Sequence, residues 1–283
     1  MSSVGPNPHD VTTAPNSRFR RLRPLGAALA ALMLVSGCAT SPLGRSQLIL
    51  FPESQMEQMG VAAYADIKSN ETATSNGTTN RYVQCVSDHI LRVLPDDDPT
   101  QWEITVFESE QANAFALPGR KIGVYTGLLN VADDQDQLAT VIGHEIAHVL
   151  AQHSNERVST ASLAQTSLQV VQIATGANTP AKQQLIGLLG AGAQYGIILP
   201  FGRKQESEAD LVGLDLMATA GFDPRASVRL WQNMAQQGGQ RPPEFASTHP
   251  SSERRINDLN ERMQKAMQLS LQARQAGRNP DCR

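Results

Sequence analysis

The chain has 283 residues, of which 40% are apolar and 18% charged, an ordinary composition for a globular protein with one substantial core. This composition excludes a chain that is disordered throughout. The formal net charge is −3, and residues 38–283 alone hold 20 basic and 26 acidic side chains. Such a balance leaves no large basic surface, so we expect no nucleic-acid partner.

Residues 1–37 have the pattern of an export signal. Four arginines between residues 18 and 23 precede an apolar run from Leu25 to Val35. Eleven residues fall short of the roughly 20 that a helix needs to cross a bilayer. The pattern therefore favours a signal peptide over a permanent membrane anchor.

The apolar run ends in the sequence Val35-Ser36-Gly37-Cys38. This sequence resembles the lipobox of bacterial lipoproteins, in which the cysteine is acylated and becomes the mature N-terminus. The resemblance implies a lipid on Cys38 that tethers the protein to a membrane. Because Ala39 rather than Asp follows, it also implies the periplasmic face of the outer membrane. The alternative is an ordinary signal peptide followed by a chance cysteine.

Two further cysteines, Cys85 and Cys282, remain once Cys38 is assigned to lipid. An even pair in an oxidising compartment is a candidate disulfide. Such a bridge would join the C-terminus to an early helix. Two unrelated thiols are the alternative.

After Cys38 the pattern predicts a short tether, a helix, a small sheet and then a long helical region. Residues 69–80 are rich in Ser, Asn, Thr and Gly and predict a loop. Apolar residues at helical spacing predict a helix over 81–94, and alternation predicts a strand over 102–107. Pro118-Gly119 is a turn signal between two further strand patterns, so we expect a hairpin-like pair over 113–117 and 121–125.

An HExxH motif, His144-Glu145-Ile146-Ala147-His148, lies in a segment with helical apolar spacing, residues 133–153. Residues four apart project from nearly the same face of a helix, so His144 and His148 can offer two imidazole nitrogens to one metal ion. Glu145 lies beside the first ligand and can act as general base toward a water on that metal. The motif predicts a single catalytic zinc ion per chain, against the alternative of surface His and Glu on an ordinary helix.

A catalytic zinc site needs a third protein ligand. The pattern HExxHxxGxxH would supply a third histidine, but Ala151 and Ser154 stand where Gly and His are required. His153 falls one residue short, and we expect a solvated histidine at the helix end. A glutamate on a later helix is the other solution.

Glu206-Ser207-Glu208-Ala209-Asp210 supplies such glutamates. Glu206 and Asp210 are four apart and share a helix face, so one can bind zinc while the other accepts a hydrogen bond from a ligand histidine. Glu208 is expected to point largely away from that face. We therefore predict Glu206 as the third ligand and Asp210 as its hydrogen-bonding neighbour.

Taken together, four motifs resemble the HtpX/BepA/LoiP type of zinc endopeptidase, the family that also contains the CAAX prenyl endopeptidase and the mitochondrial protease OMA. They are HEIAH, the ESEAD segment, Asn113 to Gly119, and Ser247-Thr248-His249-Pro250. The resemblance covers approximately residues 45–265. In that family the glutamate of ExxAD is the third zinc ligand, which agrees with Glu206.

The resemblance implies roles for three further residues. Asn113 and Ala114 would lie on an edge strand that pairs with an extended polypeptide substrate. His249 would either approach the zinc as a fourth ligand and close the site, or stabilise the oxyanion of the transition state. Arg255 matches a family position without an expected role.

The expected fold is α+β, a predominantly helical minimal gluzincin with a small sheet beside the HExxH helix. The expected parts are a lipoprotein signal peptide over 1–37, a lipid tether and N-terminal segment over 38–80, the zinc metalloprotease domain over 81–265 and a C-terminal tail over 266–283. Residues 160–199 predict two helices separated by a break at 176–180. We expect them to cover the cleft and pack on the core, and contact with the membrane surface is the alternative.

The expected function is a zinc metalloendopeptidase that cleaves unfolded or exported envelope proteins and acts in outer-membrane protein quality control. The alternative is a periplasmic chaperone or assembly factor that holds extended chains for the outer-membrane assembly machinery. Glu145 favours turnover, because a pure binding protein has no need of the base.

Overall fold

The computed structural model describes residues 38–95, 98–175, 199–237, 245, 248–249 and 253–282. The expected signal peptide and the expected helix break at 176–180 lie outside these residues. The chain divides into two compact units, Met1–Cys38 and Ala39–Arg283. The elements described below belong to the second unit, apart from Cys38 at the start of the first strand.

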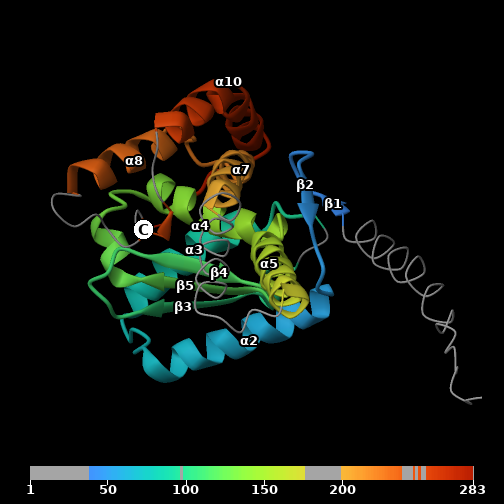
Figure 1. The fold of residues 1–283 in the computed structure, drawn as a ribbon. Coiled ribbons are helices and arrows are strands. Elements are labelled where there is room, and N and C mark those ends of the chain that lie inside the picture. Colours follow the sequence, from blue (N-terminus) through green and yellow to red (C-terminus); the bar gives the residue numbers. More distant parts are fainter. Residues whose placement is uncertain are drawn as a thin grey trace, which may run out of the picture. The chain divides into compact units, whose positions relative to one another are not determined.

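A three-stranded sheet forms the middle of this unit (Figure 1). Its strands are β3 (Glu103–Phe107), β4 (Ala114–Leu117) and β5 (Lys121–Tyr125), in the order β3-β5-β4. The predicted hairpin is confirmed, because β4 and β5 pair antiparallel from Ala114 opposite Val124 to Leu117 opposite Lys121. β5 pairs with β3 in parallel, so β4 is an edge strand among the described strands.

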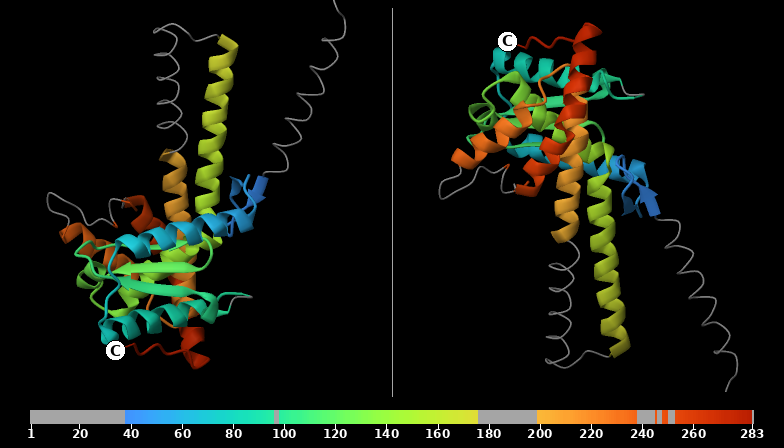
Figure 2. Two further views of the ribbon diagram at one scale, coloured as in Figure 1. Left: turned by 90° about the horizontal axis from the view of Figure 1, so that it is seen from below. Right: turned by 90° about the horizontal axis from the view of Figure 1, so that it is seen from above.

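The two faces of the sheet are covered by different helices. Helix α2 (Glu53–Asn70) packs on one face, where Tyr64 meets the ring of Phe115 and donates a hydrogen bond of 2.6 Å to Thr105. Helices α3 (Gly77–Leu91) and α4 (Gln135–Leu150) pack on the other face (Figure 2). Apolar residues of β4 and β5 alternate toward this second side and join the main core, as strand geometry requires.

The loop predicted over 69–80 is shorter than expected. Helix α2 continues to Asn70 and α3 already begins at Gly77. Asn76 explains the early start, since its side chain accepts hydrogen bonds from the backbone N–H groups of Thr78 and Thr79. An asparagine in this capping position stabilises a helix N-terminus by about 1 kcal/mol, which offsets part of the weak helix propensity of the residues that follow.

Helix α7 (Leu199–Thr219) crosses α4 at a point where two glycines meet. A Cβ atom on Gly213 would lie 2.7 Å from the backbone nitrogen of His144, and one on Gly143 would lie 2.9 Å from the Gly213 carbonyl oxygen. Glu206, Asp210 and Gly213 follow the i, i+4, i+7 spacing of one helix face. The close crossing therefore directs both carboxylates toward the HExxH motif.

The remaining elements complete a mainly helical fold, which confirms the expected α+β class. They are β1 (Cys38–Thr40), β2 (Ser46–Leu48), the 3₁₀ helices η2 (Pro99–Gln101) and η3 (Thr126–Asn130), and the helices α5 (His153–Thr175), α8 (Ala226–Gln237) and α10 (Glu253–Gln275). The expected domain boundaries at residues 80 and 265 fall inside α3 and α10. Within the described residues, no helix combines the length and apolar character needed to cross a membrane.

The second half of α5 differs from the expectation that residues 160–199 pack on the core. Leu163 and Val170 are 38% and 59% exposed, and α5 extends away from the sheet in Figure 2. Its residues are mostly small or polar, so this half of the helix has no apolar face wide enough to bury. The second expected helix lies largely outside the described residues.

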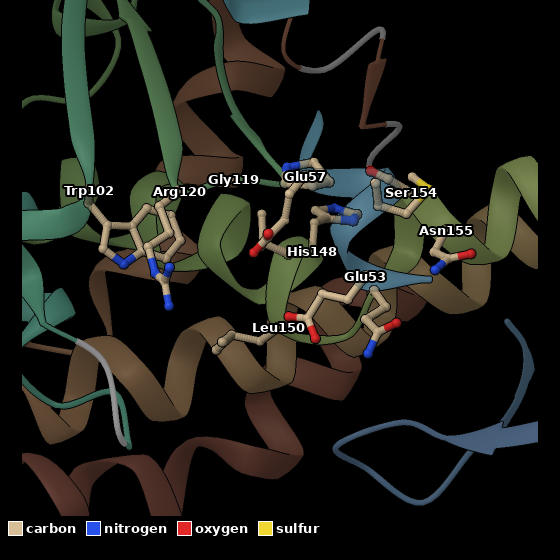
Figure 3. A pocket seen from close by; sticks show the side chains of 13 residues that line it. Glu53, Glu57, Trp102, Gly119, Arg120, His148, Leu150, Ser154 and Asn155 are labelled. Carbon is tan, nitrogen blue, oxygen red and sulfur yellow. The ribbon is translucent and has the colours of Figure 1, made fainter. Parts of the chain in front are cut away.

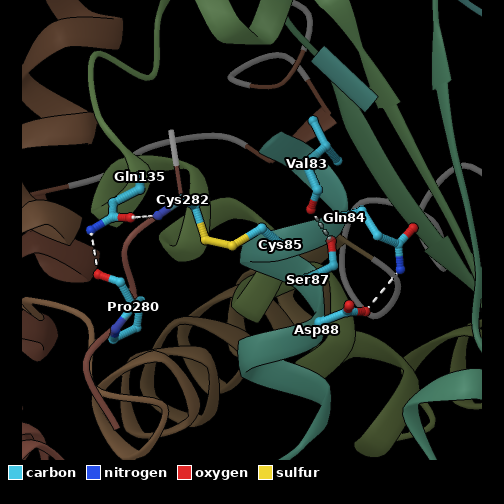
Figure 4. Close-up of a disulfide and its surroundings, with 8 residues drawn as sticks. All are labelled: Val83, Gln84, Cys85, Ser87, Asp88, Gln135, Pro280 and Cys282. Carbon is cyan, nitrogen blue, oxygen red and sulfur yellow. Dashed lines mark hydrogen bonds between the residues drawn. A yellow bond between two sulfur atoms is a disulfide. The ribbon is translucent and has the colours of Figure 1, made fainter. Parts of the chain in front are cut away.

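A disulfide joins Cys85 on α3 to Cys282 near the C-terminus (Figure 4). The segment after α10 returns to this point, where the side chain of Gln135 accepts a hydrogen bond from the Cys282 backbone and donates one to the Pro280 carbonyl. Ala266, Ala273 and Cys282 are buried, so residues 266–282 contribute to the core.

Replacing Cys282 by Ser is expected to lower the free energy of unfolding by about 2 to 5 kcal/mol. The bridge spans 197 residues, so its loss releases a large amount of chain entropy in the unfolded state. Chemical denaturation of wild type and Cys282→Ser, each with and without reductant, measures the difference. If reductant destabilises both proteins equally, the bridge does not form.

Candidate metal centre

Four side chains from three parts of the fold converge on one point. His144 and His148 come from α4, Glu206 from α7 and His249 from the segment before α10. One donor atom from each lies within 4.8 Å of all the others. His144 Nε2 lies 3.0 Å from His148 Nε2, and His249 Nδ1 lies 2.8 Å from Glu206 Oε2. Three nitrogens and one carboxylate oxygen are a donor set that suits zinc.

The ring atom of His144 that faces away from this point is held by a carboxylate. Its Nδ1 lies 3.1 Å from Asp210 Oδ1, and Asp210 in turn accepts hydrogen bonds of 2.6 and 2.7 Å from Arg255. Arg255 also donates to the His249 carbonyl oxygen at 3.0 Å. This arrangement fixes the ring orientation of His144 and leaves Nε2 for the metal. Asp210 thus contacts the ring of His144, and Arg255 contacts both Asp210 and the His249 backbone.

Burial and these partners shift the ionisation of the group. Burial alone lowers the pKa of His144, but hydrogen bonds to Asp210 and Glu206 raise it to about 9. Burial raises the pKa of Glu206, but hydrogen bonds from His144, His148 and His249 outweigh it and hold that pKa well below its usual value. Burial lowers the pKa of His148. A zinc site made of these residues would use Glu206 in its ionised form and His144 and His148 in their neutral forms.

Glu145 follows His144 on α4 and is almost completely buried. Its Oε1 atom accepts no hydrogen bond within the described residues, although His249 Nε2 lies 3.4 Å away. Burial raises the pKa of this carboxyl, whereas nearby His249 and His144 and a hydrogen bond from the Ala116 backbone lower it. A buried carboxylate oxygen without a donor is costly unless a ligand or water completes it. The centre therefore fits a zinc ion with a water beside Glu145.

His249 is positioned by its own segment. Its ring stacks on Phe245 with centroids 4.6 Å apart, and its backbone N–H donates to the Phe245 carbonyl at 2.8 Å. Nδ1 faces Glu206 and His144, whereas Nε2 faces Glu145. His249 therefore lies close enough to the donor group to be a fourth metal ligand, and it also lies next to Glu145.

The edge strand β4 runs beside this group. Glu145 contacts the backbone of Ala116, so the base lies directly against the strand. Ala114 is the first residue of β4, and Asn113 precedes it with an Oδ1 atom that has no hydrogen-bond partner in the described part of the chain. The Ala112 carbonyl accepts a hydrogen bond of 2.9 Å from Phe245. Phe245, four residues before His249, thus lies against the loop that leads into β4.

A cavity of about 200 Å³ opens on the other side of His148 (Figure 3). It lies between α2, the β4–β5 turn and the junction of α4 with α5. Its lining is mixed, with apolar Trp102 and Leu150 beside the charged side chains of Glu53, Glu57 and Arg120. The cavity adjoins a metal ligand and can receive a substrate side chain.

His153 differs from the expectation of a solvated histidine at the end of the HExxH helix. It is 1% exposed and begins a new helix, because α4 ends at Leu150 and Gln152 adopts a left-handed backbone with φ of 52°. The turn brings His153 back to His148, with the two Nδ1 atoms 2.9 Å apart. Glu208 is absent from the donor group, as expected, and is buried against His153 at 3.2 Å.

Comparison with known proteins shows to which family the chain belongs. The sequence profile described as Peptidase family M48 matches residues 78–263, which include both zinc segments and His249. The chain belongs to peptidase family M48. The resemblance to the HtpX/BepA/OMA group and the zinc requirement of its site are thereby confirmed.

Relatives within the M48 family have informative names. The mitochondrial metalloendopeptidase OMA1 of Schizosaccharomyces pombe is 36% identical over 210 residues, which are 72% of this chain and 60% of the relative. The human metalloendopeptidase OMA1 is 31% identical over 245 residues, 81% of this chain and 46% of the relative.

The beta-barrel assembly-enhancing protease of Escherichia coli (strain K12) is 29% identical over 272 residues, 90% of this chain and 55% of the relative. The chain therefore spans about half the length of these M48 relatives. The metalloendopeptidase names confirm the expected class of enzyme, a zinc metalloendopeptidase, for the M48 site.

Proposed function

We propose that this protein is a zinc-dependent endopeptidase that cleaves extended segments of unfolded or exported envelope proteins. One observation supports the proposal above others. His144, His148 and Glu206 converge as a ligand set, and the buried Glu145 presents to the same space a carboxylate oxygen that accepts no hydrogen bond from any described residue. A site that only stored a metal would have no use for that carboxylate.

Each residue then has a chemical task. His144, His148 and Glu206 would hold a zinc ion, which would supply Lewis acidity and lower the pKa of a water toward 7. Glu145 takes the proton of the attacking water and later delivers it to the leaving amine. Asp210 keeps His144 in the tautomer that binds through Nε2.

The substrate is held as an added strand on β4. A main-chain hydrogen bond to Ala114 and a contact with the side-chain oxygen of Asn113 would fix the peptide beside Glu145 without reading its sequence, so specificity is broad. The cavity beside His148 receives one side chain of the substrate, and its mixed acidic and basic lining admits several residue types.

Metal removal tests the activity directly. Purified protein should cleave unfolded casein, lose that activity in the presence of a chelator and regain it when zinc is returned. Elemental analysis should show one zinc ion per chain. Hydrolysis that persists in the metal-free protein would refute the proposal.

We further propose that Cys38 carries lipid and holds the protein on the periplasmic face of the outer membrane. The Val35-Ser36-Gly37-Cys38 sequence supports this placement, as does the similarity to beta-barrel assembly-enhancing proteases of Escherichia coli and Yersinia pestis. The similarity to mitochondrial OMA1 proteins carries no such information. In cells grown with labelled palmitate, the wild-type protein should become labelled. Label on the Cys38→Ala protein would contradict the proposed lipid on Cys38.

An assembly role at the outer membrane is the second candidate. It is favoured by the similarity to the beta-barrel assembly-enhancing protease of Escherichia coli, which covers 90% of this chain. In that role the β4 edge would hold unfinished outer-membrane proteins for the assembly machinery. Comparison of outer-membrane proteomes between wild type and a Glu145→Gln strain distinguishes the two, because a chaperone role would survive this substitution.

His249→Ala is expected to raise turnover several-fold while zinc remains bound. Its Nδ1 lies among the donor atoms, so we assign His249 as a removable fourth ligand that competes with substrate and water. Steady-state cleavage of a casein-derived peptide and zinc content measure the two effects. A fall of roughly 100-fold or more would instead identify an oxyanion donor. Unchanged turnover in His249→Ala would show that His249 has no role in catalysis.

A further inference from the structure

The second zinc histidine is held in a different way from the first. On His144, the ring nitrogen opposite the metal-facing one meets Asp210 directly. On His148, that nitrogen meets another imidazole, with His148 Nδ1 lying 2.9 Å from His153 Nδ1. The far nitrogen of His153, Nε2, lies 3.2 Å from Glu208 Oε2. All three side chains are buried.

The direction of each hydrogen bond in this chain follows from the ligand role of His148. Its Nε2 faces His144 and Glu206, so a metal there requires the lone pair of Nε2 and leaves the proton on Nδ1. His148 Nδ1 must therefore donate to His153 Nδ1. A neutral His153 then carries its own proton on Nε2 and donates it to Glu208. Every donor meets an acceptor, and the chain ends on a carboxylate.

Glu208 is fixed by the N-terminal segment. It accepts hydrogen bonds from Arg45 Nε at 3.0 Å, from the Ser41 hydroxyl and from the Leu43 backbone at 3.3 Å. Arg45 forms a second, bidentate pair with the buried Glu156 at 2.6 and 2.7 Å. The guanidinium therefore lies between two buried carboxylates and sets the position of both.

The same N-terminal segment is attached along α5 by further hydrogen bonds. The Leu50 backbone donates to Ser159 at 2.9 Å, and the Asn155 side chain donates to the Phe51 carbonyl at 2.8 Å. β2 lies beside α5, which carries His153 at its first turn (Figure 1). These contacts hold residues 41–51 against the start of the helix.

We propose that His153 and Glu208 are positioning residues for the zinc ligand His148, and that Arg45 of the N-terminal segment holds Glu208 in place for this task. The inference rests on the proposed zinc function. It gives the two ligand histidines matching supports, Asp210 with Arg255 for His144, and His153 with Glu208 and Arg45 for His148. The segment that follows Cys38 is thereby part of the metal centre's support.

The test measures zinc affinity in the full chain by competition with a chromogenic chelator. His153→Phe keeps a ring of similar size but removes both hydrogen bonds, and it should weaken zinc binding by roughly 10- to 100-fold, the range for lost outer contacts of metal ligands. Glu208→Gln retains an acceptor for His153 and should weaken binding less than His153→Phe. Arg45→Ala should weaken zinc binding and Arg45→Lys should restore only part of it, because the single ammonium group of Lys cannot hold Glu208 and Glu156 in the fixed geometry of the guanidinium.

Ser159→Ala is the matched control. It removes one contact of the same N-terminal segment with α5 but touches neither His153 nor Glu208, so its zinc affinity should equal that of wild type. Thermal unfolding of the metal-free proteins reports any general loss of stability. Cobalt-substituted protein gives a second readout, since an altered visible spectrum in His153→Phe indicates a changed ligand geometry.

Three outcomes overturn the inference. The first is a His153→Phe protein with wild-type zinc affinity and an unchanged cobalt spectrum. The second is a Ser159→Ala protein whose zinc binding is weakened as much as that of His153→Phe. The third is an Arg45→Ala protein with wild-type zinc affinity. Failure of the proposed function has a separate signature, a wild-type protein that binds zinc tightly but hydrolyses nothing. If His153→Phe fails to fold, the comparison of Glu208→Gln with Ser159→Ala decides the question, and equal zinc affinities of those two proteins overturn the inference.

Discussion

Glu145→Gln is expected to abolish measurable proteolysis while zinc stays bound at one ion per chain. The amide has nearly the same shape as the carboxylate but cannot take a proton from water, and loss of a general base lowers turnover by about 10²- to 10⁴-fold. Glu145 is not among the converging donor atoms, so the metal should remain. Turnover of an unfolded protein substrate, measured beside zinc content, checks both parts.

Glu253→Gln serves as the control for this substitution. It makes the same chemical change at an exposed position in the first turn of α10, and turnover should match wild type. A Glu145→Gln protein that retains a tenth or more of wild-type turnover would show that another group acts as the base. Loss of zinc from this variant would instead indicate that Glu145 supports the metal.

Glu206→Ala is expected to lose zinc altogether, with an affinity change larger than the roughly 10- to 100-fold of an outer contact. The variant removes the only carboxylate of the donor group found among the described residues. Binding of a ligand to the folded state alone, at a concentration 100 times its Kd, stabilises a protein by about 2.7 kcal/mol. Added zinc should therefore raise the unfolding temperature of wild type but leave that of Glu206→Ala unchanged.

The comparison with Glu208 separates the two glutamates of the same segment. Glu208→Gln should still bind one zinc ion when zinc is in excess, although less tightly than wild type. If Glu208→Gln loses zinc and Glu206→Ala keeps it, Glu206 is not the ligand. The removed Glu206 carboxylate also contacts Arg157 and Arg255, so metal-free stability should be measured for each variant.

The features that could be predicted from sequence are those with a fixed local geometry. The i, i+4 spacing of His144 and His148 and of Glu206 and Asp210 determines which side chains share a helix face, and the structure brings these two faces together. The Pro118-Gly119 turn likewise determines the register of β4 and β5. In each case the information lies within about ten residues of sequence.

The supports of the metal centre could not be predicted in this way. His153 follows a turn in which Gln152, a residue without a glycine's conformational freedom, adopts a positive φ, and nothing local indicates that turn. Arg45 meets Glu208 across 163 residues, and Arg255 meets Asp210 across 45. Such pairs depend on tertiary packing, which apolar periodicity and residue spacing do not encode.

The bond between Cys85 and Cys282 makes residues 85–282 a covalently closed ring. The ring contains all four metal donors, strand β4 and the two crossing helices α4 and α7. Arg45 and α2 lie outside it. Local unfolding that starts at the N-terminus can therefore detach the residues before Cys85 while the disulfide stays intact. Proteolytic cleavage between residues 46 and 84 would then separate the N-terminal peptide from a still cross-linked body that retains His144, His148 and His249 but lacks Arg45.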